Sequence, residues 1–432
     1  AGTIDSQSGE TNQLVINSPS TTLAGSIGTN AALSRLATDG AGTTFIGGSR
    51  IVTTTELLFQ DPVILTSDLA ADGGSGTINF QSTLDSDTNL ARALTLAASS
   101  IRLDSTTGGI QALASMAASG STITTGRVTT TRGQTYTPTT SMTLAGDLRS
   151  IVAGPITING PLVLAADGID IATNGASADD DIFLRTVNSS AGTNRSLALN
   201  AGSLGGVVFD GNVGQIDRLG AVTVAGSTTE VRTDALSAQS WAFNGPATIF
   251  ELTNITGDTV DFTSLVTLNA GATIVGSGAS GRVTFGGDIL SPNARNALAV
   301  NAVTTLFSGV IGGTGSALGD LTTDAAGTTT LGGGAINATG NIVFSDAIEL
   351  TRDLTVTNTN SNGQVSFQNI ISTGGNRAMV VDALAPTFFR GTVGGTNSAQ
   401  NLASLSVSGG GTTEISSAIN TTGGQTYSDA MR

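Results

Sequence analysis

The chain contains no cysteine, no histidine and no lysine, and each absence removes a class of chemistry. Without cysteine it has neither disulfides nor thiolate metal ligands. Without histidine and lysine it has no imidazole base and no amine that could form a Schiff base. Carboxylates are the main catalytic groups left, so the sequence predicts a protein that is not an enzyme and needs no cofactor.

Positive charge is also scarce. All 17 basic residues are arginine, and 32 acidic residues bring the net charge to −15. A chain this acidic repels phosphate backbones and anionic lipid headgroups, which argues against nucleic acid or a membrane surface as a partner. The sequence has no apolar run of about 18 residues, so no membrane insertion is expected.

What the chain does have is an internal repeat. An alternating apolar tetrad occurs five times, at residues 14–17, 94–97, 197–200, 298–301 and 379–382. Four of the five are followed by an apolar residue and then x-Gly-x-Val/Ile-Gly, at 23–28, 209–214, 307–312 and 389–394. The tetrads end at 17, 97, 200, 301 and 382. Their successive spacings are close to four, five, five and four multiples of a unit of about 20 residues, which is the length of a solenoid coil.

The repeat predicts one continuous β-solenoid over residues 1–432, with repeats opening near 14, 94, 197, 298 and 379. On this interpretation the sequence begins and ends within a repeat, since Thr3–Ser6 matches Thr83–Ser86. Apolar and small polar residues alternate along the short strand signals, so one face of each strand points inward. We therefore expect a right-handed parallel β-helix of about 20 residues per coil and about 21 coils, roughly 100 Å long.

Stacked coils place equivalent residues above one another, so ladders of Phe, Ile or Asn are expected. Asn17, Asn200 and Asn301 are predicted to turn inward and satisfy backbone groups. Two pairs of motifs also recur with the same separation along the chain: Leu36–Asp39 with Leu321–Asp324, and Phe59–Asp61 with Phe344–Asp346. A Gly-Gln-Thr-Tyr sequence ends at both Tyr136 and Tyr427.

Several of these motifs resemble a known group of proteins. Residues 307–313, 318–329 and 421–430 are similar to the repeats of filamentous-haemagglutinin-like and autotransporter-passenger-like bacterial β-solenoids. The resemblance covers nearly the whole chain. It implies an extracellular or cell-surface location and a role in adhesion, biofilm or surface coats.

The preferred hypothesis is a non-catalytic structural segment of an extracellular bacterial surface or filament protein. It would form a stiff rod that assembles with itself, head to tail or side by side. The first alternative is an adhesin module whose loops bind carbohydrate or a host receptor. The second is a polysaccharide-degrading enzyme with paired carboxylates, for which the candidates are Asp167 with Asp170, Asp258 with Asp261, and the run Asp179 to Asp181.

Two smaller sets of residues have alternative interpretations. Asp179, Asp180 and Asp181 form the densest carboxylate cluster, which is either a weak calcium site or a solvated loop, and the loop is favoured. Arg92, Arg195 and Arg377 each lie two residues before the tetrad of a repeat. They are either a column that binds anions or glycans, or recurrent turn residues, and the turn is favoured.

Overall fold

The computed structural model describes residues 2–251, 253–292 and 295–432. It is an all-β parallel solenoid of about 19 turns, which confirms the predicted fold class. The single helical element among the described residues is a short 3₁₀ helix, η1 (Ser398–Gln400). The right-handed winding stays a prediction.

The chain divides into two compact units, and each is described separately. The first comprises residues 1–220 and 225–227, and the second comprises residues 221–224 and 228–432. The strands up to the boundary are β1 (Gln13–Ile16), β2 (Ser20–Leu23), β3 (Leu33–Thr38), β4 (Thr43–Ile46), β5 (Arg50–Phe59), β6 (Val63–Leu65), β7 (Leu69–Phe80), β8 (Leu84–Ser86), β9 (Ala93–Leu103), β10 (Ser115–Thr125), β11 (Val128–Thr130), β12 (Gln134–Leu144), β13 (Leu148–Ser150), β14 (Ile156–Ile158), β15 (Leu162–Leu164), β16 (Ile169–Thr173), β17 (Ile182–Leu184), β18 (Val187–Ser189), β19 (Leu197–Asn200), β20 (Val207–Phe209) and β21 (Leu219–Ala225).

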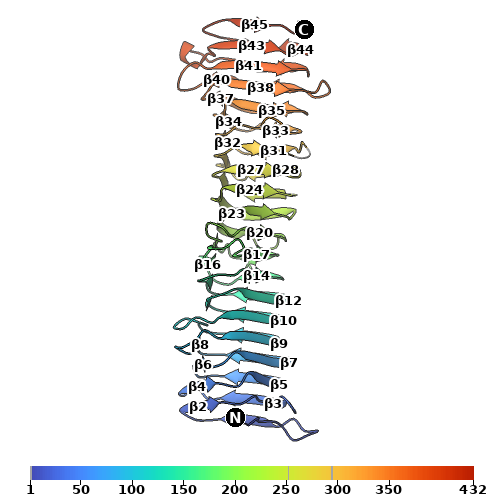
Figure 1. The fold of residues 1–432 in the computed structure, drawn as a ribbon. Coiled ribbons are helices and arrows are strands. Elements are labelled where there is room, and N and C mark those ends of the chain that lie inside the picture. The colour runs from blue at the N-terminus through green and yellow to red at the C-terminus, as the bar shows by residue number, and fades with distance from the viewer. Residues whose placement is uncertain (1, 252, 293–294) are drawn as a thin grey trace. The chain divides into compact units, whose positions relative to one another are not determined.

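The remaining strands are β22 (Thr229–Val231), β23 (Ala235–Phe243), β24 (Ala247–Phe250), β25 (Thr253–Gly257), β26 (Thr259–Phe262), β27 (Leu265–Leu268), β28 (Ala272–Gly276), β29 (Arg282–Phe285), β30 (Ile289–Leu290), β31 (Leu298–Asn301), β32 (Thr304–Phe307), β33 (Leu321–Thr323), β34 (Thr328–Leu331), β35 (Ala335–Ala338), β36 (Ile342–Val343), β37 (Ala347–Leu350), β38 (Leu354–Asn358), β39 (Val365–Phe367), β40 (Ile370–Ser372), β41 (Ala378–Ala383), β42 (Thr387–Phe389), β43 (Ser404–Ser408), β44 (Thr412–Ile415), β45 (Gln425–Tyr427) and β46 (Ala430–Met431). Within each unit, the strands of one coil pair in parallel with the strands of the next (Figure 1).

Alternation in the sequence explains which side chains form the core. In β16, Ile169, Ile171 and Thr173 are buried, whereas Asp170 and Ala172 are only partly covered. The same two-residue pattern recurs in most strands, because successive side chains of a strand point to opposite faces. Apolar side chains therefore fill the interior of each coil, and the strand backbones hydrogen-bond to the coils above and below.

Within each unit the tetrads do not stack on one another, which corrects the whole-number spacing inferred from the sequence. In the first unit, Leu14 heads one column of paired residues, Leu94 belongs to a second column, and Leu199 of the third tetrad belongs to a third. The first column is Leu14, Leu36, Leu57, Ile78, Ile101, Ile123, Met142 and Leu162. The second is Leu69, Leu94, Met116, Gln134, Ile156, Ile182 and Val207. The third is Thr21, Thr44, Val63, Leu84, Thr107, Val128, Leu148, Ile171 and Leu199.

The second unit repeats this behaviour. Leu298 pairs with Leu321, and that column continues to Thr387 and Thr413, whereas Met379 pairs with Leu354 in a different column. Within each unit, a sequence repeat is therefore not a whole number of turns, and each repeat opens at a different position of the coil than the repeat before it.

Variable coil length is the reason. Gln13 pairs with Arg35 in the next coil, whereas Ile156 pairs with Ile182, so the second of these coils is the longer. Loops between strands absorb the extra residues without disturbing the parallel pairing. Coils longer than the expected unit also explain why the solenoid has about 19 turns where about 21 were expected.

Phenylalanine forms the predicted ladders. In the second unit, Phe243, Phe262, Phe285 and Phe307 stack on successive coils, with ring centroids 4.9, 5.1 and 5.1 Å apart. Shorter ladders join Phe59 to Phe80, and Phe344 to Phe367 and Phe389. These separations are close to the strand spacing of about 4.8 Å, so each ring covers the face of the ring below it.

The predicted inward asparagine ladder is wrong. Asn17, Asn200 and Asn301 are all exposed. The side chain of Asn200 accepts a hydrogen bond from the backbone N–H of Gly202 at 3.0 Å, so it supports a surface turn. These asparagines lie on the outward phase of the alternation, where a polar side chain keeps its contact with water.

We expect the tryptophan fluorescence to report on the core of the second unit. Trp241 is the single tryptophan, is 1% exposed, stacks on Phe243 at 5.6 Å, and donates a hydrogen bond to the carbonyl of Thr256. Its emission should therefore be blue-shifted and resistant to acrylamide quenching until the unit unfolds. Emission like that of free tryptophan under native conditions would contradict this placement.

Candidate functional site

The first polar cluster inside the solenoid is built around a buried aspartate. Asp61 is 1% exposed and lies just after β5. The hydroxyl of Thr38 donates to one carboxylate oxygen at 2.6 Å, and the hydroxyl of Thr44 donates to the other at 2.8 Å. The three side chains come from two adjacent coils, so the cluster holds these coils together at the corner.

The same cluster occurs a second time, in the second unit. Thr323 and Thr329 each donate to one carboxylate oxygen of Asp346 at 2.7 Å. Asp346 is 3% exposed, and removal of its carboxylate from water raises its pKa above the ordinary value. We call these two clusters the aspartate corners. The sequence signal for the aspartate corners was that the Leu36 and Phe59 motifs are equally far from their counterparts. This signal did not reveal that the Leu36 motif meets the Phe59 motif in space, or that their counterparts meet in the same way.

A second recurring corner precedes each tetrad. A buried serine accepts a hydrogen bond from the backbone N–H of a residue five or six positions later, and this occurs in all five repeats. The pairs are Ser6 with Asn12, Ser86 with Arg92, Ser189 with Arg195, Ser291 with Asn296 and Ser372 with Arg377, at 2.7 to 3.0 Å. The matching bonds of Ser6 and Ser86 support the predicted equivalence of Thr3–Ser6 and Thr83–Ser86.

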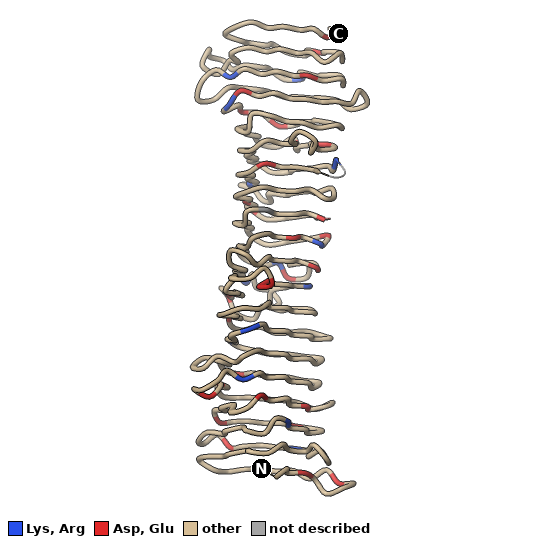
Figure 2. The backbone as a smooth tube through the Cα atoms, viewed as in Figure 1, with Lys and Arg blue, Asp and Glu red and all other residues tan. Residues whose placement is uncertain are grey.

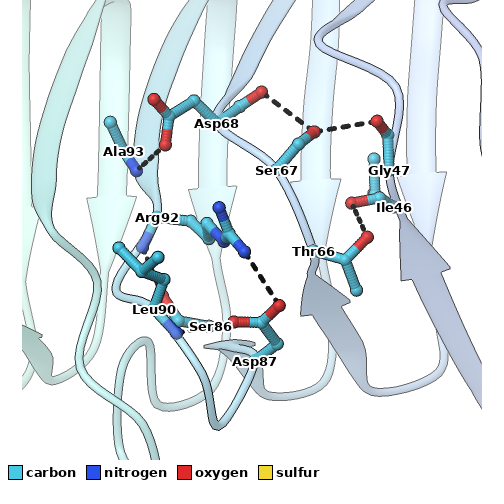
Figure 3. Close-up of polar contacts among 10 residues, drawn as sticks. All are labelled: Ile46, Gly47, Thr66, Ser67, Asp68, Ser86, Asp87, Leu90, Arg92 and Ala93. Carbon is cyan, nitrogen blue, oxygen red and sulfur yellow. Dashed lines mark hydrogen bonds and ion pairs between the residues drawn. The ribbon is translucent and has the colours of Figure 1, made fainter.

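Figure 3 shows one such corner with its cross-coil bonds. The carboxylate of Asp68 accepts from the backbone N–H of Ala93 in the next coil at 2.9 Å. In the other direction along the solenoid, the hydroxyls of Thr66 and Ser67 donate to the carbonyls of Ile46 and Gly47. Polar side chains at these corners therefore replace the backbone pairing that stops where a strand ends.

The arginines at these corners are turn residues, as favoured from the sequence. The backbone of each binds its serine, and the guanidinium of Arg92 donates to Asp87 at 3.0 Å. The hydrogen bond from Arg92 lowers the pKa of Asp87. The guanidinium of Arg377 donates to the carbonyl of Gly374 at 3.0 Å. Because their repeats open in different columns, Arg92 and Arg195 do not form one column on the surface.

Each of the two Gly-Gln-Thr-Tyr motifs forms a hydrogen-bond cluster of the same kind. The hydroxyl of Tyr136 donates to Gln134 at 2.9 Å, and that of Tyr427 donates to Gln425 at 3.0 Å. The amide of Gln134 also donates to the carbonyl of Arg149 in the following coil at 3.0 Å. Both Gln134 and Tyr136 are fully buried, so the cluster that these two residues form is part of the core.

Burial makes the two tyrosines titrate differently. Loss of hydration raises the pKa of Tyr136 far above its usual value of 10, and it raises the pKa of the partly exposed Tyr427 as well. We expect the folded chain to show a single tyrosinate step, which Tyr427→Phe removes and Tyr136→Phe leaves unchanged. Alkaline absorbance titration measures it, with far-ultraviolet circular dichroism to verify folding. A step that disappears in Tyr136→Phe would show that Tyr136 is accessible.

The candidate calcium residues lie at one corner of the first unit but engage different partners. The buried carboxylate of Asp180 accepts from the backbone N–H groups of Gly154 and Ser177, and that of Asp181 accepts from Gly206 at 2.6 Å. Asp179 and Asp181 line an open depression beside Phe183. Within the described ranges, no group of three or more His, Cys, Asp or Glu side chains is placed to hold a metal ion.

The paired aspartates proposed for glycoside hydrolysis also have structural partners. Asp167 accepts from the backbone N–H of Ser196 at 2.8 Å, and that bond lowers its pKa. Asp170 pairs with Arg149 at 2.7 Å, although desolvation raises its pKa. Asp261 pairs with Arg282 at 2.8 Å, and Asp258 accepts from the hydroxyl of Ser277. Each carboxylate thus contributes to turns or to contacts between coils.

Charged residues are sparse over both units. Figure 2 shows acidic and basic positions scattered over otherwise uncharged coils. Several arginines pair with a carboxylate one coil away, such as Arg35 with Glu56 and Arg149 with Asp170. In the part of the chain that the structure describes, no helix is long and apolar enough to span a membrane.

Comparison with known proteins finds a bacterial relative. Over 468 aligned residues, the chain is 26% identical to outer membrane protein A of Rickettsia rickettsii. The alignment covers 97% of this chain but only 19% of that protein, so the chain spans about a fifth of its relative. No family model matches, and no solved structure matches. The chain is thus a β-solenoid with sequence similarity to one stretch of a much longer bacterial outer membrane protein.

Proposed function

We propose that the chain is a non-catalytic structural segment of a bacterial surface protein, in which it acts as a stiff spacer. The observation that carries the proposal is the use of its polar groups. The aspartate corners, the serine corners and most of the ion pairs join one coil to the next or close a turn. A chain whose charged and polar side chains are engaged in this way is built to resist bending.

Similarity to an outer membrane protein and the solenoid fold support an extracellular, cell-surface location. The acidic, lysine-free composition supports a surface that does not bind nucleic acid or anionic lipid. Self-association, head to tail or side by side, belongs to the same proposal.

Small-angle scattering and electron microscopy test the spacer. About 19 turns at roughly 4.8 Å per turn add up to about 90 Å, and a stiff spacer of that length should be seen as a single extended particle. Two lobes at variable angles would contradict the stiff spacer. Sedimentation at rising concentration tests self-association, and a strictly monomeric chain would remove that part of the proposal.

Location is tested separately. Antibodies raised against the chain should label intact, unpermeabilised cells of the bacterium that produces it, and external protease should remove the label. Labelling that requires permeabilisation would contradict a surface location.

A further inference from the structure

One face of the first unit carries a depression that the proposed spacer role does not use. It lies over β4, β6 and β8 and has a volume of about 330 Å³. Phe45 and Ile64 line it as register partners on adjacent coils, and Pro62 lines it as well. Both side chains point outward and are only half-buried, because the strand neighbours of each take the buried positions. These neighbours are Thr44 and Ile46 for Phe45, and Val63 and Leu65 for Ile64.

Exposed apolar residues border this depression. Ile110 lines it and is 81% exposed. On the other side of Ile110 lies a second depression, which is also lined by Leu90 and Ile151 at 62% and 47% exposure. Large apolar side chains gathered around concave surface are typical of protein-binding sites rather than of an inert surface.

The fold does not need these apolar residues, because the chain contains an internal control. Residues 321–350 repeat residues 36–65 at a constant separation, including the aspartate corner that anchors this face. In that second copy, Phe45 and Ile64 correspond to Thr330 and Glu349, which are register partners in the same way. The identical scaffold therefore accepts polar residues at both positions.

Ile110 has a polar counterpart as well. Its backbone N–H donates to Asp85 at 2.8 Å, and in the first coils the backbone N–H of Asn30 donates to Asp5 at 2.9 Å in the same arrangement. An asparagine thus occupies the corner without loss of the turn. The fold thus tolerates polar side chains at three positions that are apolar here. We take this as an indication that the apolar side chains serve binding.

Charge limits what can bind. The charged side chains that line the two depressions are Asp85, which is 6% exposed, and Asp87, which pairs with the nearby Arg92. The net charge of the chain is −15, so this face attracts positively charged groups more than negatively charged ones. A partner that places basic residues around an apolar group would be attracted to it.

From these observations we propose that this face is a docking site for a protein segment that inserts an aromatic or large aliphatic side chain between Phe45, Ile64 and Ile110, with basic residues on either side. The apolar anchor supplies most of the affinity because it is desolvated in the depression. The negative net charge of the chain supplies attraction and selectivity. The inference goes beyond the spacer function and does not depend on it.

The probes are labelled synthetic peptides with a central Trp flanked by arginines, matched peptides with aspartate flanks, and matched peptides with a central Gly. Fluorescence anisotropy with the full chain should show saturable binding of the Arg-flanked Trp peptide alone. The triple variant Phe45→Thr/Ile64→Glu/Ile110→Asn, which introduces the residues found at the equivalent positions elsewhere in the chain, should weaken it at least tenfold. Ile216→Asn replaces an isoleucine that is 83% exposed and lies outside both depressions, so it should leave binding unchanged.

The variant Ile64→Glu separates anchoring from simple attraction. It adds a negative charge, so it should strengthen the binding of an arginine peptide that is held by charge alone. It should weaken the binding of a peptide that is held by its apolar anchor. The proposal is overturned if no peptide binds, if the triple variant still binds, or if Ile64→Glu binds more tightly. Binding of a glycan that the triple variant loses, without peptide binding, would replace it with a carbohydrate site. Unchanged circular dichroism and Trp241 emission verify that the variants fold.

Discussion

Replacing Phe262 with alanine should lower the free energy of unfolding of the second unit by about 3–5 kcal/mol. Phe262 is 1% exposed and lies in the middle of the longest phenylalanine ladder, 4.9 Å from Phe243 and 5.1 Å from Phe285. Phe250 meets it edge-on at 5.6 Å. Truncation removes the buried area of one ring and the stacking on both sides, and the backbone pairing of the coils prevents the cavity from closing.

Chemical denaturation followed by Trp241 emission measures this loss, since Trp241 stacks on Phe243 in the same ladder. Leu384→Ala is the matched control, because Leu384 is 48% exposed and its truncation should change stability by less than about 0.5 kcal/mol. A loss below about 1 kcal/mol for Phe262→Ala would mean that the ladder is not a continuous packed core.

The second large effect is expected at the aspartate corner of the second unit. Thr329→Val removes the hydroxyl that donates to Asp346 at 2.7 Å and leaves one buried carboxylate oxygen without a donor. At neutral pH this should cost about 1.5–3 kcal/mol, the range for hydrogen bonds to charged groups. Equilibrium denaturation of the two proteins at one pH gives the difference directly.

Thr305 provides a control on the adjacent coil. It is the register partner of Thr329 and is 1% exposed, but its hydroxyl has no hydrogen-bond partner among the described residues. Thr305→Val makes the same atomic replacement without breaking a hydrogen bond, so it should be neutral or stabilising. Equal losses in Thr305→Val and Thr329→Val would show that the bond to Asp346 contributes nothing.

The cost of Thr329→Val should fall as the solution becomes more acidic. Burial raises the pKa of Asp346 above 3.8, and the bond from Thr329 partly opposes that rise, so the variant raises the pKa further. A raised pKa means that the folded state binds the proton more tightly than the unfolded state. Asp346 therefore adds stability below pH 3.8 and loses that contribution as pH rises through its folded pKa.

The difference between wild type and variant should thus be largest at neutral pH and should shrink as pH falls through the folded pKa of Asp346, below which the carboxyl is neutral in both proteins. Asp346→Asn removes the titrating group and should abolish the pH dependence of the difference when it is combined with Thr329→Val. A gap that widens in acid would contradict the assignment.

The sequence predicted much of this architecture. Period-two alternation identified the strands and their inward faces, and recurrent phenylalanines such as Phe285 and Phe367 indicated ladders. The absence of histidine, lysine and cysteine limits the available chemistry through composition alone. Those features are local or compositional, so they can be read without knowledge of which coils are neighbours.

The sequence could not decide which residues share a column. Alternation determines whether a side chain points inward, but each turn can take up extra residues, and coil length varies from one turn to the next. For this reason Leu14 and Leu94 belong to different columns although their motifs match. The roles of Asp61 and Asp346 were hidden for the same reason, since each meets two threonines 17 and 23 residues earlier in the chain.

The sequence by itself therefore determined the class of fold and the identity of the core, because burial follows from the order of apolar and polar residues. The tertiary structure decided which coils lie against each other, which carboxylates are engaged, and where Phe45, Ile64 and Ile110 gather on one face. These properties depend on distances between residues that are a full coil or more apart in the chain, and those distances are set by the turns that close each coil.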